Sequence, residues 1–174
     1  MDARHADRDD ALEHVRPCEV VPAGFGYGIG CATLLRMPTA AQDRYVPDPT
    51  PETQPFWDGT RAGELRLQRC EVCDRAYFPP RPFCPRCASR QVRWFKALGR
   101  ATLYSYVIHH RPVPGFSPPY SIAVVELEEG PRMMSNIVEC PQTPEALVLD
   151  MPLEVLFMPV SSDISVPLFR PAAK

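Results

Sequence analysis

The sequence predicts an α+β fold that is mostly β: a short helix, then a metal-binding ribbon, then a small closed barrel at the C-terminal end. Two Cys-x-x-Cys pairs stand ten residues apart, at Cys70/Cys73 and Cys84/Cys87. Residues 101–170 divide into short apolar runs separated by proline and glycine turns. The 174 residues include 22 prolines and nine glycines, which favours short strands and stiff connections over long helices.

Composition divides the chain into an arm at 1–52, a helix plus ribbon at 53–97 and a barrel at 98–174. The arm is polar, with glycines alternating near its middle and prolines at its end, and we expect it to be disordered. Met37 is a plausible start, in which case residues 1–36 are an artefact of start-codon choice.

A short helix is expected from Thr53, which would cap its N-terminus, to Thr60. It carries two large aromatic side chains, Phe56 and Trp57. A ribbon and a small barrel each have little interior, so we expect these rings to lie at an interface with a partner protein.

The ribbon follows. Leu65 and Leu67 alternate with polar residues in a strand that leads to the first cysteine pair, and residues 92–95 begin the strand that leaves the ribbon. Two close Cys-x-x-Cys pairs predict four thiolates around one metal ion, with Cys70, Cys73, Cys84 and Cys87 as ligands. Zinc is favoured, although spacing alone does not separate it from iron. All four ligand positions are filled, so the predicted role is structural.

Five short strands are expected in the barrel, which fits the OB type. They are residues 101–109, 120–127, 132–139, 153–158 and 166–169.

Charge is distributed unevenly along the chain. Residues 61–100 hold ten basic and three acidic side chains, although the whole chain has a formal net charge of −2. Part of this excess positive charge offsets the negative charge of the thiolates. The rest predicts a surface that attracts anions.

Several function classes are disfavoured. No run of about 18 apolar residues predicts a membrane span, and seven cysteines without a signal peptide point to the reducing cytoplasm. No local signature of a catalytic nucleophile is present. As neighbours in a strand, His109 and His110 face opposite sides, so at most one can point into a given site. The possible acid–base groups Glu126, Glu128 and Glu129 crowd a turn. The sequence therefore favours a chain that is not an enzyme on its own.

Two alternatives stay open. The basic ribbon beside a barrel could bind single-stranded nucleic acid, with Tyr104 and Tyr106 on one strand face for stacking. The strands at 120–127 and 132–139 lack an aromatic platform, which makes this the weaker interpretation. A four-cysteine iron centre would instead indicate electron transfer.

A further set of motifs occurs in order along residues 53–172: Pro55-Phe56-Trp57-Asp58-Gly59, Leu67-Gln68-Arg69-Cys70, Pro79-Pro80-Arg81, Cys84-Pro85-Arg86-Cys87, Trp94, Gly99, Pro119-Tyr120 and Phe169-Arg170-Pro171. With these motifs the chain resembles the family of zinc-ribbon OB-fold proteins associated with acyl-CoA enzymes. Where such ribbons usually have glycine after each second cysteine, this chain has Asp74 and Ala88, and positive φ there would strain Ala88.

The resemblance implies a rubredoxin-like zinc ribbon, an OB barrel and a non-catalytic accessory subunit in lipid, steroid or related metabolism. The implied partner is a thiolase-like enzyme or an acyl-CoA hydratase, with acyl-CoA at a shared site. CoA needs only a few guanidinium contacts for its phosphates, and Arg69, Arg81 and Arg93 are the candidates. The arm at 1–52 lies outside the resemblance.

Overall fold

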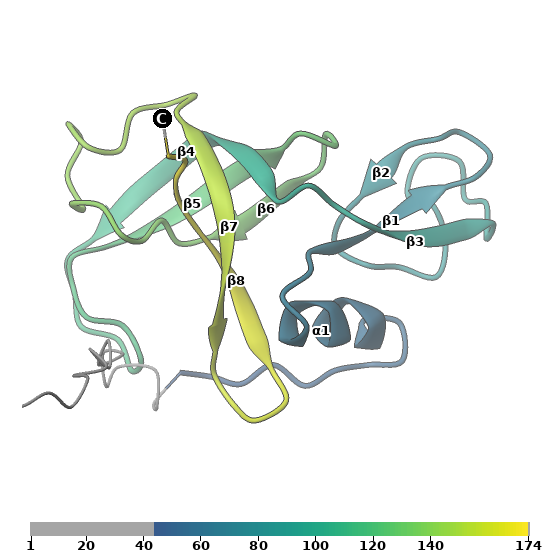
Figure 1. Ribbon diagram of the computed structural model, residues 1–174, viewed down its shortest axis with the longest axis horizontal. Coiled ribbons are helices and arrows are strands. Elements are labelled where there is room, and N and C mark those ends of the chain that lie inside the picture. The colour runs from purple at the N-terminus through teal and green to yellow at the C-terminus, as the bar shows by residue number, and fades with distance from the viewer. Residues whose placement is uncertain (1–43, 174) are drawn as a thin grey trace, which may run out of the picture. The chain divides into compact units, whose positions relative to one another are not determined.

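The computed structural model describes residues 44–173. The possible start-site segment 1–36, and the rest of the predicted arm up to residue 43, lie outside the described residues. The structure confirms the predicted fold class: one short helix followed by strands in two sheets (Figure 1). In chain order the elements are α1 (Gln54–Arg61), β1 (Arg66–Cys70), β2 (Ala76–Tyr77), β3 (Val92–Lys96), β4 (Arg100–His109), β5 (Tyr120–Leu127), β6 (Arg132–Ser135), β7 (Pro152–Pro159) and β8 (Ser165–Pro171).

The ribbon is a three-stranded antiparallel sheet with β1 in its centre, between β2 and β3. The barrel sheet has five antiparallel strands in the order β6-β5-β4-β7-β8. It curves so that a parallel bridge joins Ile137, just beyond β6, to Phe169 on β8. This bridge connects the two outer strands, as an OB-type barrel requires.

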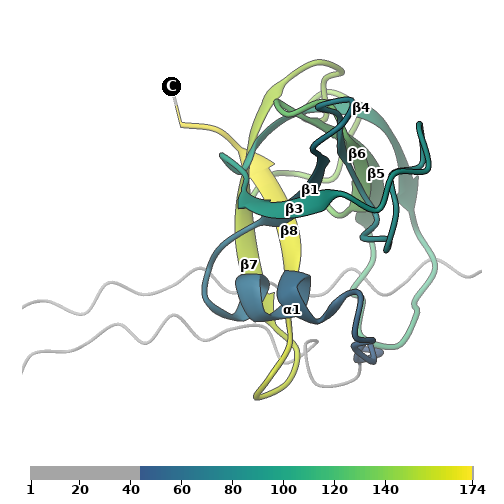
Figure 2. The ribbon, with the colours of Figure 1, turned by 90° about the vertical axis from the view of Figure 1, so that its right-hand side faces the viewer.

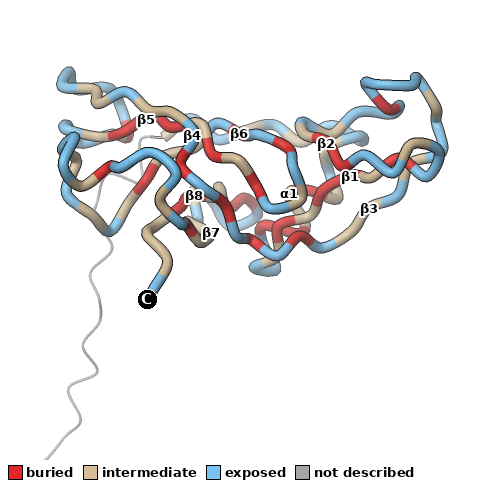
Figure 3. Tube along the Cα trace, turned by 90° about the horizontal axis from the view of Figure 1, so that it is seen from above, coloured by how far each residue is buried: buried red, intermediate tan, exposed pale blue. Residues whose placement is uncertain are grey.

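One hydrophobic core joins the helix, the base of the ribbon and the barrel. Phe56 on α1 and Leu67 on β1 belong to the same buried cluster as Leu103, Val125 and Phe169 of the barrel. The far end of the ribbon has a separate small cluster around the cysteines. Figure 3 shows these buried stretches along β1, β4 and β5, and Figure 2 shows α1 beside the lower ends of β7 and β8. The helix therefore takes part in the core and is not an appendage.

The start of α1 differs from the expected cap. Thr53 occupies the N-cap position, but its side chain makes no cap hydrogen bond. Its φ of −100° and ψ of −12° are helical, whereas a capping side chain needs an extended backbone at this position. The Thr53 hydroxyl instead accepts a hydrogen bond from the N–H of Thr50 at 2.9 Å. Within residues 44–173 no helix has the length and apolar character needed to cross a membrane.

The strand expected at 132–139 ends early, at Ser135. Beyond Ser135, a side chain of β5 takes the place of the backbone–backbone hydrogen bonds between the two strands. The hydroxyl of fully buried Ser121 accepts a hydrogen bond from the N–H of Ile137 at 3.0 Å and donates one to its carbonyl oxygen at 3.2 Å. Glu139 has a φ of 58°, which no extended strand allows. The strands expected at 101–109 and 120–127 are confirmed as β4 and β5.

Candidate metal centre and basic cleft

The two Cys-x-x-Cys turns have the same backbone geometry. The N–H groups of Cys70 and Cys84 each donate to the carbonyl oxygen five residues later, at 3.0 and 2.8 Å. The residue after each second cysteine, Asp74 or Ala88, has a φ of 51° or 58°. The sequence predicted these left-handed positions, and the structure confirms them. Asp adopts this conformation more readily than Ala, so the second turn carries the greater strain.

These turns bring four thiols together at the end of the ribbon. The Sγ atoms of Cys70, Cys73, Cys84 and Cys87 all lie within 4.8 Å of one another. Two of the distances, Cys70 to Cys87 and Cys73 to Cys84, are 3.6 Å. Four sulfurs at about 2.3 Å from a central ion in a tetrahedron would lie about 3.8 Å apart. The four cysteines are therefore positioned to hold one metal ion.

Backbone N–H groups favour thiolates at this centre. The N–H of Cys73 is the largest influence that lowers the pKa of Cys70. Burial is the largest single influence on Cys84 and opposes its ionisation, but the N–H groups of Cys87 and of the residue before it, together with hydrogen bonds to two neighbouring sulfurs, lower the pKa of Cys84 to about 6. The N–H of Ser89 favours the Cys87 thiolate, yet burial and the neighbouring sulfurs raise the pKa of Cys87 to about 12. The neighbouring sulfurs thus oppose ionisation of the fourth thiol. A divalent cation would balance the negative charge of the thiolates.

Of the three arginines predicted to contact CoA, two lie side by side. Arg69 on β1 is opposite Arg93 on β3 in the antiparallel register, so they share a face of the ribbon. The Arg69 side chain is partly engaged: it donates to Asp74 at 3.3 Å, and its guanidinium carbon lies 5.0 Å from the centre of the Phe95 ring.

Arg81 is held through its backbone, and its side chain is exposed. Its N–H donates to the side-chain oxygen of buried Gln68 at 2.7 Å, and its carbonyl oxygen accepts from the Tyr77 hydroxyl at 3.3 Å. These bonds fix the proline-rich return between the cysteine pairs. CoA binding by the three arginines stays a prediction.

A cleft of about 780 Å³ lies between ribbon and barrel, and the sequence did not reveal it. Arg75 and Arg86 from the ribbon and Arg132 from β6 contribute three guanidinium groups to its lining, and Glu126 contributes one carboxylate. Arg132 is bound to Glu126 at 2.6 Å, whereas among residues 44–173 no acidic group forms an ion pair with Arg75 or Arg86. The cleft can therefore attract an anion. It was missed because ribbon and barrel residues far apart in sequence form it jointly.

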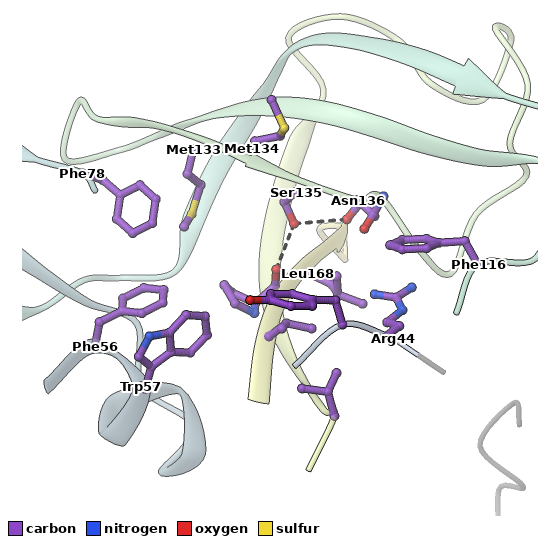
Figure 4. Close-up of a pocket in the computed structure, with 14 residues that line it drawn as sticks. Arg44, Phe56, Trp57, Phe78, Phe116, Met133, Met134, Ser135, Asn136 and Leu168 are labelled. Carbon is purple, nitrogen blue, oxygen red and sulfur yellow. Dashed lines mark hydrogen bonds between the residues drawn. The ribbon is translucent and has the colours of Figure 1, made fainter. Parts of the chain in front are cut away.

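The aromatic pair on α1 lies differently from expectation. Phe56 is only 3% exposed, with its ring centre 5.3 Å from that of Phe78 and 4.9 Å from that of Trp57. The argument that this chain cannot cover both rings is wrong for Phe56, because the ribbon and barrel share one core around it. Trp57 is half-buried and lines a second cavity (Figure 4). An interface role for this pair remains a prediction.

The two tyrosines of the possible stacking platform do not share a face. A β-bulge between Leu103 and Ser105 shifts the register of β4 against β5. Tyr106 consequently packs against the core, while Tyr104 is 47% exposed beneath the guanidinium of Arg132, 3.4 Å from its ring centre. The expectation of a shared face is wrong, which weakens the nucleic-acid alternative.

Other candidate acid–base groups are engaged in structural contacts. Glu128 binds Arg100 through both carboxylate oxygens, at 2.8 and 2.9 Å. Glu129 accepts the N–H of Leu98 at 2.7 Å, in the connection between ribbon and barrel. His109 lies 3.1 Å from the carbonyl oxygen of residue 111. These contacts give each of the three side chains a partner within the fold.

Comparison with protein families identifies two adjoining domains. The family described as "ChsH2, rubredoxin-like zinc ribbon domain" matches residues 57–93, and "ChsH2, C-terminal OB-fold domain" matches residues 94–158. The chain is 36% identical to a "Probable enoyl-CoA hydratase alpha subunit" of Thermomonospora curvata. The alignment spans 119 residues, or 67% of this chain. This chain spans only 37% of that relative's length.

Two shorter relatives are matched over more of their length. A "DUF35 domain-containing scaffold protein" of Methanocaldococcus jannaschii is 36% identical over 98 residues, which are 55% of this chain and 68% of the relative. Among solved structures, a chain of "Ltp2-ChsH2(DUF35) aldolase" aligns with a TM-score of 0.65 and 32% identity. That alignment covers 74% of this chain and 100% of the other.

Proposed function

This chain belongs to the ChsH2-type DUF35 family of zinc-ribbon OB-fold proteins, and we propose that it is a non-catalytic accessory subunit of an acyl-CoA-processing enzyme. The partner is a thiolase-like enzyme or an acyl-CoA hydratase in lipid, steroid or related metabolism. The observation that carries the proposal is the alignment with a chain of "Ltp2-ChsH2(DUF35) aldolase", which covers 74% of this chain and all of the other. Relatives named as a hydratase subunit and as a scaffold protein support the same role.

The metal in this proposal is zinc, held by Cys70, Cys73, Cys84 and Cys87. Four thiolates fill a tetrahedral zinc site and leave no position for substrate, so the ion would hold the ribbon together. A chain that keeps four thiols reduced for a metal suits the cytoplasm, which is the compartment we propose. A ferric ion in the same site would colour the protein, whereas zinc would not. Metal analysis with an absorbance spectrum therefore distinguishes the two.

The CoA moiety of the substrate would lie at the joint site, with its phosphates on the basic side of this chain. The cleft arginines Arg75 and Arg86 are better placed than the three that the sequence suggested, because they line a concave surface. Arg69, Arg81 and Arg93 remain candidates on the ribbon outside this cleft. In this proposal the helix plus ribbon comprises residues 53–97 and the barrel 98–174, with 1–52 as the arm.

Complex formation tests this proposal. We expect coexpression with a thiolase-like or hydratase-like protein encoded beside it to give a stable complex by size-exclusion chromatography. Trp57→Ala should weaken the complex by about 2 kcal/mol or more if Trp57 is a central contact. Phe83→Ala, which truncates a 42%-exposed aromatic ring on the ribbon, is the matched control. A chain that stays alone beside such partners and binds single-stranded oligonucleotides with steep salt dependence would support the nucleic-acid alternative instead.

A further inference from the structure

The second cavity lies beside α1, and no cysteine among residues 44–173 lines it. Its volume is about 350 Å³, and its walls come from α1, β6, β8 and the segment before the helix. Most lining side chains are apolar or aromatic, and among the described residues Arg44 is the one charged group that lines it. This volume is at the small end of the range for small-molecule sites, which is about 300–1,000 Å³.

Arg44 is a cation in an apolar setting. Its Nε donates to the carbonyl oxygen of Gly115 at 2.9 Å, and its guanidinium carbon lies 4.0 Å from the centre of the Phe116 ring. Burial lowers the pKa of Arg44. Within residues 44–173 no carboxylate lies within ion-pair distance of it. A partly desolvated guanidinium with spare N–H donors favours an anion in the cavity.

The cavity is polar at one end and apolar at the other. Figure 4 shows Arg44 and Phe116 on one side, close to Asn136, and Phe56 with Trp57 on the other. A ligand that matches both ends has an anionic head and a hydrocarbon body. One guanidinium suits a single negative charge, in contrast to the several charges of a nucleotide polyphosphate.

We propose that this cavity binds a free fatty carboxylate, with its head on Arg44 and its chain against Phe56 and Trp57. At about 30 Å³ for each water-sized group, the cavity has room for roughly ten carbon atoms. The site belongs to this chain alone, so the proposal goes beyond the accessory role and does not depend on a partner enzyme.

Calorimetric titration of the full chain tests the proposal with decanoate, decanol and acetate, each kept below aggregation. Decanoate should bind with one site per chain, and decanol, which has the chain without the charge, at least tenfold more weakly. Acetate should show no saturable binding. Decanoate should also change the fluorescence of Trp57, which lines the cavity.

Three variants separate the two ends of the site. Arg44→Gln should weaken decanoate binding about tenfold or more and leave decanol binding unchanged, and Arg44→Lys should restore part of the loss. Val166→Phe adds volume at a lining position on β8 and should weaken both ligands. Val107→Phe makes the same change at a 59%-exposed position on β4 outside the cavity and should alter neither.

Thermal melting shows which variants are folded. The proposal is overturned if decanoate fails to saturate the native chain, or if Val166→Phe, while folded, binds decanoate as tightly as the native chain does. It is likewise overturned if Arg44→Gln weakens decanol and decanoate equally. Complex formation with an acyl-CoA enzyme would be unaffected by any of these outcomes, so the two proposals fail separately.

Discussion

Gly99→Ala should destabilise the protein at the connection between ribbon and barrel. Gly99 is buried with a φ of 76°, and an added Cβ would lie 2.5 Å from Cγ1 of Val155. The backbone is held there by a hydrogen bond from the N–H of Val155 to the Gly99 carbonyl oxygen, at 2.8 Å. Valine has few alternative rotamers, so the contact is not relieved by a simple side-chain rotation.

The expected cost has two parts. For a residue with a Cβ, a left-handed backbone conformation costs about 1–2 kcal/mol. Overpacking in a tight core typically costs about 1–3 kcal/mol. Gly99→Ala should therefore lower the free energy of unfolding by about 2–5 kcal/mol. Gly63 is the matched control, because its φ is 74° and an added Cβ meets nothing within 4 Å. Gly63→Ala should show only the backbone part, about 1–2 kcal/mol.

Urea unfolding followed by circular dichroism measures both variants. A Val155→Ala background should remove the steric part, so that Gly99→Ala costs there about as much as Gly63→Ala does in the native chain. If Gly99→Ala costs no more than Gly63→Ala in the native chain, the close approach between the connection and β7 is refuted.

The remaining predictions concern the metal centre and the barrel. Cys84→Ser combined with Cys87→Ser should abolish binding of about one zinc per chain and unfold the ribbon, because metal binding and folding are coupled in so small a module; metal analysis and proteolysis check this. Ala88→Gly should stabilise the metal-bound chain by up to about 1 kcal/mol, since it relieves a φ of 58°, and an unchanged or lower melting temperature would contradict the inferred strain. Ser121→Ala should cost about 1–3 kcal/mol in urea unfolding, because it leaves the N–H of Ile137 without its partner, whereas exposed Ser162→Ala should cost little.

Local patterns predicted those parts of the fold that depend on neighbours in sequence. The spacing of the cysteines predicted the four-thiol cluster, and the resemblance to zinc ribbons with glycine after each second cysteine predicted the left-handed positions at Asp74 and Ala88. Alternation of apolar residues gave β4 and β5 within one residue of their ends. Each of these features is decided within a few residues, so the sequence is enough.

Features set by contacts between distant residues escaped the sequence. Strand β2 has two residues, and only its pairing with β1 defines it. The bulge at Tyr104 depends on the register with β5, and it reverses the side on which Tyr106 lies. Phe56 is buried because ribbon and barrel pack on the same core. The cleft arginines, including Arg132, come together only when the ribbon docks on β6. Periodicity within one segment carries none of this information.

If this chain acts through a larger acyl-CoA enzyme, reconstituted turnover should depend on both proteins. Acyl-CoA turnover would be measured for the chain alone, for the thiolase-like or hydratase-like protein encoded beside it, and for the purified mixture. We expect no turnover by the chain alone and a higher kcat/KM for the mixture than for the partner alone. Turnover by the chain alone, or equal activity of the partner with and without it, would show that the chain is not an accessory subunit of this enzyme.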